Sequence, residues 1–326
     1  MLTIFQRVRR EQRPADLANH QLADDVIWLD LREPTQEETE FVQAALGLEL
    51  PTREEMREIE ASARVYEEHG ALFLTATILV KADRPPPGTT EVTFILKGDR
   101  LVTLRYADPQ PFRSLAGRLE RQGNNLASAQ GLFFWLVDQI IARTADVLER
   151  AALDIDTLSG EIFGAADATA NAQKPDLLKA IARIGRSGDT AGRARECLLT
   201  LGRVLLAVGT SELSVPAQKK EARTRAKSLT RDVASLIDHA TFLSGKIGLL
   251  LDATLGMINI EQTGIIKIFS VLSIVLLPPT LIASIYGMNF DFMPELHLWI
   301  GYPGSLLLMV LSASVPFWYF RRRGWL

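Results

Sequence analysis

Oxygen-bearing side chains occur at intervals in an otherwise apolar C-terminal region, and they are the residues of this sequence that most clearly could take part in chemistry. Hydroxyl, carboxylate and amide groups recur there at Asp252, Thr263, Ser270, Ser273, Thr280, Ser284 and Asn289. Two helices of one chain cannot enclose a hydrated path, so any path through this region needs several copies of the chain around it. In such an assembly each polar side chain is repeated and becomes a ring of oxygens.

Other kinds of chemistry lack the residues that they need. The sequence contains no nucleophile elbow, phosphate-binding glycine-rich loop or dinucleotide fingerprint, so we predict that the protein is not an enzyme and uses no organic cofactor. A single cysteine, Cys197, excludes an internal disulfide framework and a multi-cysteine zinc site. A net charge of -3 and a pI near 5.9 argue against a nucleic-acid partner. The four histidines are scattered without ligand spacing, at His20, His69, His239 and His297.

Two uncharged apolar segments position the oxygen-bearing side chains. Residues 268–286 and 298–320 approach or exceed the ~20 apolar residues that cross a hydrocarbon core of ~30 Å. Aromatic residues at the ends of both segments are typical of interfacial anchors. Helices of a soluble core rarely run this long without a charge. We therefore predict two transmembrane helices, over residues 265–286 and 298–320, in contact with a lipid bilayer.

Flanking charges predict the orientation of these spans. Basic residues lie on one side of the pair, at Lys246, Lys267, Arg321, Arg322 and Arg323. The connecting loop, residues 287–297, has no lysine or arginine but carries Asp291 and Glu295, which make it an external acidic loop. By the positive-inside rule both termini are cytoplasmic, including the basic tail 321–326. The N-terminus shows no signal peptide, so we predict a multi-pass protein of the inner membrane in a bacterial-type cell.

The sequence before the spans divides into two predicted parts. Residues 1–110 contain strand patterns at 25–31 and 63–80, a hairpin around Gly98-Asp99, and helices opened by capping boxes at Thr35/Glu38 and Thr52/Glu55. This pattern predicts an α+β cytoplasmic head. Residues 111–264 show helical patterns over 127–163, over 174–208 and from Pro216 onward. The last of these meets no further proline until Pro278, which predicts a long helical stalk that continues into the first span.

Charge is distributed unevenly along the head. Residues 24–68 hold fourteen acidic residues against four arginines. They are either solvated helix faces or an electronegative surface that concentrates or senses divalent cations. Residues 219–231 carry six basic residues against Glu221 alone, a composition typical of contact with anionic lipid or with an acidic partner.

The turn after the first span carries a resemblance to a known family. Residues 286–290 read YGMNF, residues 293–296 read MPEL, and the tail reads RRRGWL. With the whole run of residues 260–296, these motifs resemble the CorA family of magnesium transporters, in its proteobacterial branch. The resemblance is close over the C-terminal part. In the rest of the chain the resemblance is limited to the predicted architecture, which includes a WLDL strand followed by Pro-Thr.

The resemblance implies a funnel-shaped homopentamer. Its cytoplasmic head would be of the α/β/α type, its stalk helices would continue as pore-lining first spans, and the second spans would form an outer ring. The resemblance also implies that Gly287, Met288 and Asn289 form the outer selectivity entrance. Mg²⁺ is small and holds its waters tightly, so five Asn289 carbonyls would contact the hydrated ion through its water shell. The implied cargo is Mg²⁺, with Co²⁺ or Ni²⁺ also transported, driven by the membrane potential.

Further residues take roles by the same resemblance. Thr280 lies where the family has a pore-facing hydroxyl, and Leu277 and Phe269 lie where it has hydrophobic constrictions that gate by dewetting. Asp252 matches an acidic pore position of some members, and its alternative is a stalk acid that faces solvent. Thr263 departs from the asparagine that is common at its position.

The resemblance also implies regulation by intracellular Mg²⁺ bound between protomers by carboxylates. Asp232, Asp238 and the acidic residues 24–68 are the candidates for this regulatory metal site. Two other functions stay open. One is a zinc transporter of the same fold, with or without coupling to protons, which Met288 disfavours because that branch typically carries isoleucine there. The other is a membrane-anchored sensor or scaffold that conducts nothing.

Overall fold

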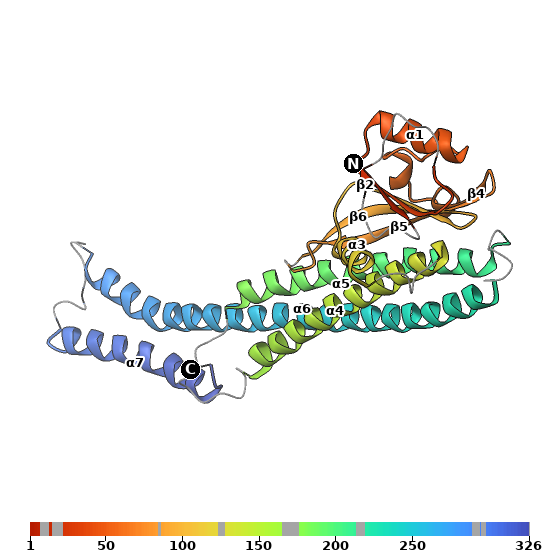
Figure 1. Ribbon diagram of the computed structural model, residues 1–326. Coiled ribbons are helices and arrows are strands. Elements are labelled where there is room, and N and C mark those ends of the chain that lie inside the picture. The colour runs from red at the N-terminus through yellow and green to blue at the C-terminus, as the bar shows by residue number, and fades with distance from the viewer. Residues whose placement is uncertain are drawn as a thin grey trace. The chain divides into compact units, whose positions relative to one another are not determined.

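The computed structural model describes residues 1–6, 13–14, 22–83, 86–122, 128–164, 176–212, 219–288, 294 and 298–325. The chain divides into two compact units, Met1–Leu251 and Asp252–Leu326. The longest helix, α6 (Lys219–Tyr286), belongs to both units because it runs through their boundary (Figure 1).

The N-terminal unit is built on a seven-stranded sheet with strand order β2-β1-β3-β7-β6-β5-β4. Its strands are β1 (Leu2–Gln6), β2 (Arg13–Pro14), β3 (Val26–Arg32), β4 (Val65–Glu68), β5 (Ala71–Val80), β6 (Gly88–Lys97) and β7 (Arg100–Arg105). Neighbouring strands are antiparallel except β3 and β7, which are parallel. The predicted hairpin joins β6 to β7, and Gly98 takes the left-handed φ of +59° that its turn requires.

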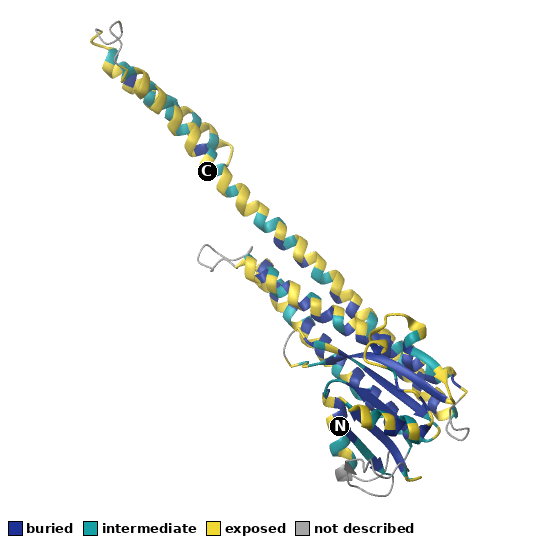
Figure 2. Cartoon of the chain, turned by 90° about the horizontal axis from the view of Figure 1, so that it is seen from above, coloured by how far each residue is buried: buried dark blue, intermediate teal, exposed yellow. Residues whose placement is uncertain are grey.

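Helices cover both faces of this sheet, which confirms the predicted α/β/α head (Figure 1). They are α1 (Gln36–Leu46), the 3₁₀ turn η1 (Glu55–Arg57), α2 (Ala61–Arg64), α3 (Gln110–Gln122), α4 (Ala129–Gly164) and α5 (Leu177–Thr210). On one face, Phe41 and Met56 belong to the same buried apolar cluster as Leu29 of β3. On the other face, Trp28 and Phe94 belong to one buried apolar cluster with residues of α3 to α6. The strands of the sheet are mostly coloured as buried (Figure 2).

Both predicted capping boxes form, but they lead to different elements. At the start of α1, Glu38 N–H donates to Thr35 Oγ1 at 3.3 Å and Thr35 N–H donates to Glu38 Oε2 at 2.9 Å. The same reciprocal bonds join Thr52 and Glu55, yet the expected second acidic helix is only the single turn η1. Met56 is the one buried side chain of that turn, so too little apolar surface is buried to support further turns.

The two C-terminal helices are α6 and α7 (Gly301–Arg322), and both are long and apolar enough to cross a membrane. Only 6% of the most apolar window of each helix is buried, so neither is the core helix of the described chain. The long helix continues through Pro278 and Pro279. Because proline has no N–H, the carbonyls four residues earlier, of Ile274 and Val275, lose their helical donors.

Candidate functional site

The helix α6 places the predicted pore residues on one of its sides. At 100° per residue, Asp252, Phe269, Leu277 and Thr280 fall within an arc of about 100°. All four are exposed in the single chain, with 65% of Phe269 and 66% of Leu277 accessible. Val271, which is 3% exposed, lies on the opposite side of the helix. The structure thus brings the four residues together on a helix face that one chain leaves uncovered.

Hydroxyl groups along α6 are oriented by bonds to their own backbone. Thr263, Ser273 and Thr280 each donate to the carbonyl oxygen four residues earlier, at 2.7, 2.9 and 2.7 Å respectively. Because each hydroxyl proton is engaged, the oxygen lone pairs are the part of the group that can contact a solute. Lone pairs accept hydrogen bonds from water, including the water shell of a cation. The bonds of these three hydroxyls therefore leave their oxygens available as hydrogen-bond acceptors.

The C-terminal end of α6 holds the first two residues of the predicted entrance. Gly287 N–H donates to Ala283 O at 2.9 Å, and Met288, which is 48% exposed, donates its N–H to Ile285 O at 3.3 Å. A Cβ at position 287 would lie 3.0 Å from Ala283 O, so glycine permits this close approach. Asn289, Asp291 and Glu295 lie outside the described residues.

The predicted regulatory carboxylates do not form a metal site within one chain. Asp232 and Asp238 are both exposed on α6. Six residues of helix place them about 120° apart around the axis and about 9 Å apart along it, so they cannot contact the same ion. Across the residues that the structure describes, no group of three or more histidine, cysteine or acidic side chains is arranged to hold a metal.

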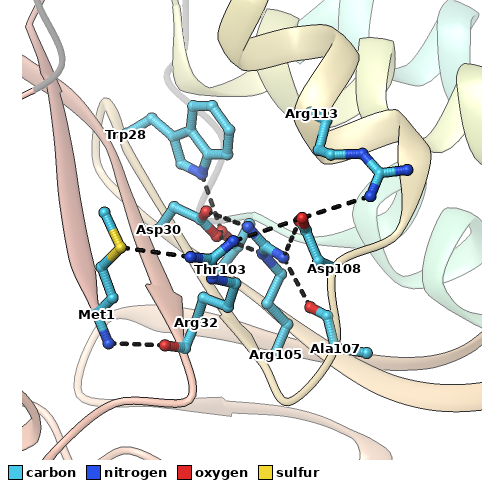
Figure 3. Close-up of polar contacts among 9 residues, drawn as sticks. All are labelled: Met1, Trp28, Asp30, Arg32, Thr103, Arg105, Ala107, Asp108 and Arg113. Atoms are coloured by element: carbon cyan, nitrogen blue, oxygen red, sulfur yellow. Dashed lines mark hydrogen bonds and ion pairs between the residues drawn. The ribbon is translucent and has the colours of Figure 1, made fainter.

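Sequence reasoning missed a buried polar network between the parallel strands β3 and β7 (Figure 3). Arg105 donates from Nε to Asp30 Oδ1 at 2.9 Å and from Nη2 to Asp30 Oδ2 at 2.7 Å. Thr103 donates to the same Oδ1 at 2.7 Å and accepts from Trp28 Nε1 at 2.9 Å. Asp30 is only 6% exposed, so its interpretation as one of the solvated acids is wrong.

Asp108 extends the network toward solvent. Arg105 Nη1 donates to Asp108 Oδ1 at 2.8 Å, while Arg32 and Arg113 lie 3.4 and 3.5 Å from its other oxygen. Burial opposes the charge of Arg105, but the hydrogen bonds and charges of Asp30 and Asp108 raise the pKa of its guanidinium above the ordinary value. The signal in the sequence was an aspartate at the centre of an apolar strand, in the WLDL motif. Because hydrogen bonds of 2.7–2.9 Å in the network join residues of β3 and β7, we infer that the network stabilises the sheet.

Comparison with known proteins identifies the family. The family described as CorA-like Mg²⁺ transporter protein matches residues 23–322, which is most of the chain. The chain belongs to the CorA family. It is 35% identical over 326 residues to the magnesium transport proteins CorA of Salmonella typhimurium and Escherichia coli, with 100% of each chain covered. It is 38% identical over 303 residues to the CorA of Pasteurella multocida, with 93% of both chains covered.

Solved structures show the CorA fold across the whole chain. The complete CorA magnesium transporter from Methanocaldococcus jannaschii aligns with a TM-score of 0.75 at 19% identity, covering 100% of this chain and 98% of that one. The cytoplasmic domain of ZntB from Vibrio parahaemolyticus aligns with a TM-score of 0.56 at 8% identity, covering 79% of this chain and 97% of that one. At these identities the likeness extends to the fold alone, so the second neighbour lends no support to zinc as the cargo.

Proposed function

We propose that this CorA-family chain transports Mg²⁺ across a membrane, through a path that several copies enclose with their α6 helices. The observation that carries the proposal is the exposed face of α6, which aligns Asp252, Phe269, Leu277 and Thr280. An uncovered face with both apolar and oxygen-bearing residues fits a pore better than a lipid contact. The curated relatives at 35% identity are magnesium transport proteins, which supports Mg²⁺ as the cargo.

The assembly that we propose is a funnel-shaped homopentamer in the inner membrane. Residues 1–110 form its cytoplasmic head and residues 111–264 its cytoplasmic helical region and stalk. The spans 265–286 and 298–320 flank the external loop 287–297, and the tail 321–326 returns to the cytoplasm. Basic residues on one side of the spans and acidic residues in the loop support this topology.

Transport in this scheme follows the membrane potential. Each positive charge that moves inward gains ~2.3 kcal/mol per 100 mV, so a divalent ion needs no nucleotide hydrolysis. Asn289 contacts the hydrated ion at the entrance beside Gly287 and Met288, and the Thr280 hydroxyls accept hydrogen bonds from its waters. Leu277 and Phe269 form apolar rings that close the path when they lose water. Co²⁺ and Ni²⁺ follow the same route because they too move as hydrated divalent ions.

Closure by intracellular Mg²⁺ is the regulatory part of the proposal. The ion would bind between neighbouring copies through carboxylates such as Asp232 and Asp238, which one chain cannot bring to a common ion. Loss of the ion would let like charges repel and would favour the open state. Replacing both aspartates by asparagine is expected to leave uptake active at Mg²⁺ concentrations that close the wild type.

Replacement of Asn289 by alanine tests the entrance. Mg²⁺ uptake into Mg²⁺-starved cells should fall severalfold or more, because the ring of amide oxygens is lost. The matched control is Gln36→Ala, which removes an exposed amide from α1 in the head and none from α6. Equal amounts of membrane-inserted protein are verified for both variants. Uptake by Asn289→Ala at the wild-type rate would contradict the assignment.

Ion flux into liposomes distinguishes Mg²⁺ transport from the two alternatives, a zinc transporter and a sensor or scaffold that conducts nothing. Purified protein is reconstituted, and Mg²⁺, Co²⁺, Ni²⁺ and Zn²⁺ entry is measured with and without a proton gradient. We expect Mg²⁺ flux without a proton requirement. Zn²⁺ flux that depends on protons would favour the zinc transporter, and an absence of flux for every ion would favour the sensor or scaffold.

A further inference from the structure

The C-terminal end of α7 is fixed by a specific helix-capping turn. Trp325 N–H donates to Phe320 O at 3.1 Å, and Gly324 N–H donates to Arg321 O at 3.2 Å. Gly324 has a left-handed φ of +69°. These features define a Schellman motif, and its customary apolar contact is present because the rings of Phe320 and Trp325 lie 5.2 Å apart. The end of the chain up to Trp325 thus has a defined conformation.

Three cations near this turn lie over aromatic rings. Arg322 is 3.9 Å from the ring centre of Trp318, and Arg323 is 5.2 Å from that of Tyr319. Lys267 of α6 lies 5.7 Å from the ring centre of Trp325. Contacts of this kind attract a cation to the ring face and restrict its position. We call this set the basic–aromatic cluster, with members Lys267, Trp318, Tyr319, Arg322, Arg323 and Trp325.

The sequence around the cluster supplies positive charge without carboxylates. Neither residues 262–288 nor residues 298–325 contain an aspartate or glutamate, and Arg321 adds a further cation beside the cluster. Aromatic rings hold a cation but do not neutralise it. The cluster therefore keeps a net positive charge that can attract an anion from outside the chain.

The position of the cluster indicates where that anion comes from. Lys267 precedes the uncharged apolar run of α6, and Arg322 and Arg323 directly follow that of α7. Tryptophan and tyrosine are enriched at the boundary between hydrocarbon and water. Phosphate groups of anionic lipids lie at this same depth and attract basic side chains.

We propose that the basic–aromatic cluster is a binding site for the phosphate group of an anionic phospholipid. Arg322 and Arg323 offer several N–H donors in the planar geometry that suits phosphate oxygens, and Lys267 adds a compact charge from the other helix. The Schellman turn fixes Trp325 at the end of α7, where its ring contacts Lys267 of α6. The site differs in place and in chemistry from the path proposed for Mg²⁺.

Spin-labelled lipids test the site on the full-length protein. The wild type is reconstituted in phosphatidylcholine, and the fraction of labelled phosphatidylglycerol held at the protein is compared with that of labelled phosphatidylcholine. We expect a clear preference for phosphatidylglycerol. One cation near an anionic surface contributes about fivefold in association, so Arg322→Gln and Arg323→Gln should each lower the preference by up to this factor.

Two further variants distinguish specific binding of the lipid at the basic–aromatic cluster from nonspecific attraction of the lipid to positive charge. Arg321→Gln removes one charge from the same tail but no contact with a ring, and it should leave most of the preference intact. Gly324→Ala keeps every charge but strains the turn, and it should lower the preference. Equal losses in Arg321→Gln and Arg323→Gln, or no preference in the wild type, would overturn the proposal. Each variant is first shown to reconstitute with the oligomeric state of the wild type.

Discussion

At the scale of residues, Asp30 and Arg105 show how strongly a buried ion pair depends on having both partners. Their side chains are 9% and 6% exposed, and their two hydrogen bonds satisfy both carboxylate oxygens. Burial of either charge alone would be costly, because its hydration is lost without compensation. The residues lie 75 positions apart, so the network depends on the pairing of β3 with β7.

Replacing Asp30 by alanine should destabilise the head by about 3–5 kcal/mol, because Arg105 would keep a buried charge without its main partner. Chemical or thermal unfolding of the purified protein measures the change. The control is Glu37→Ala, which removes an exposed acid from α1 and should change stability by less than about 0.5 kcal/mol. Similar unfolding midpoints for the two variants would contradict a bracing role for the network.

Burial of the Cys197 thiol predicts a loss of stability at alkaline pH. Burial raises its pKa from an ordinary 9.0 to about 11. Below pH 9 the thiol is protonated in both states, whereas between pH 9 and 11 only the unfolded state releases the proton. The folded state should therefore lose up to about 2–3 kcal/mol across this interval. Unfolding measured from pH 8 to 11 should show a shallower decline in Cys197→Ala than in the wild type, and parallel curves would contradict the effect.

At the scale of elements, the helical period of α6 decides which side chains share a face. Leu277 and Ile268 are both apolar and similarly exposed, at 66% and 59%. They nevertheless lie on different sides of the helix, since nine residues rotate the chain by about 180°. Residue type and exposure therefore do not distinguish Leu277 from Ile268, but the position around the helix axis does.

Leu277→Ala should raise Mg²⁺ leak under conditions that close the wild type, because a smaller side chain widens the apolar constriction and favours water. Ile268→Ala, a comparable truncation on another face, should behave as the wild type does. Flux into liposomes at high Mg²⁺ on the head side measures both. Equal leak through the two variants would argue against Leu277 as a constriction.

Local elements were the part of the fold that the sequence predicted best. The capping box at Thr35 and the hairpin at Gly98 depend on neighbouring residues, and both are present in the structure. The helix expected after Thr52 is only a single turn. Its capping box forms, but the turn buries too little apolar surface to support further turns. The parallel pairing of β3 with β7 joins residues far apart in the chain, so the local WLDL pattern could not identify Arg105 as the partner of Asp30.

At the scale of the whole molecule, the uncovered face of α6 predicts contact between copies. In a Cys197→Ala background, Thr280→Cys should form disulfide-linked dimers in mild oxidant, because symmetry brings equivalent residues of neighbouring copies toward a common axis. Ile268→Cys should not, since it lies on another face. Non-reducing gels of membranes measure both. Equal cross-linking at the two positions would contradict the proposed ring.

The candidate site was predictable to the extent that it follows from periodicity and from family motifs. Asp252, Phe269, Leu277 and Thr280 were named individually, and the structure places them on one helix face. Contacts between chains are a property of the assembly, so a single sequence could not specify the carboxylates of a shared regulatory site. The contact of Lys267 with the ring of Trp325 depends on how α6 and α7 approach each other, which spacing within either helix does not reveal.

The paired prolines of α6 have a mechanical consequence. Missing donors at Pro278 and Pro279 leave a short stretch of the helix with fewer restraints than the turns on either side, and helices bend most easily at such points. Leu277 lies immediately before this stretch and Thr280 immediately after it. We therefore expect α6 to bend between Leu277 and Thr280, so that the segment that carries Leu277 tilts relative to the segment that carries Thr280.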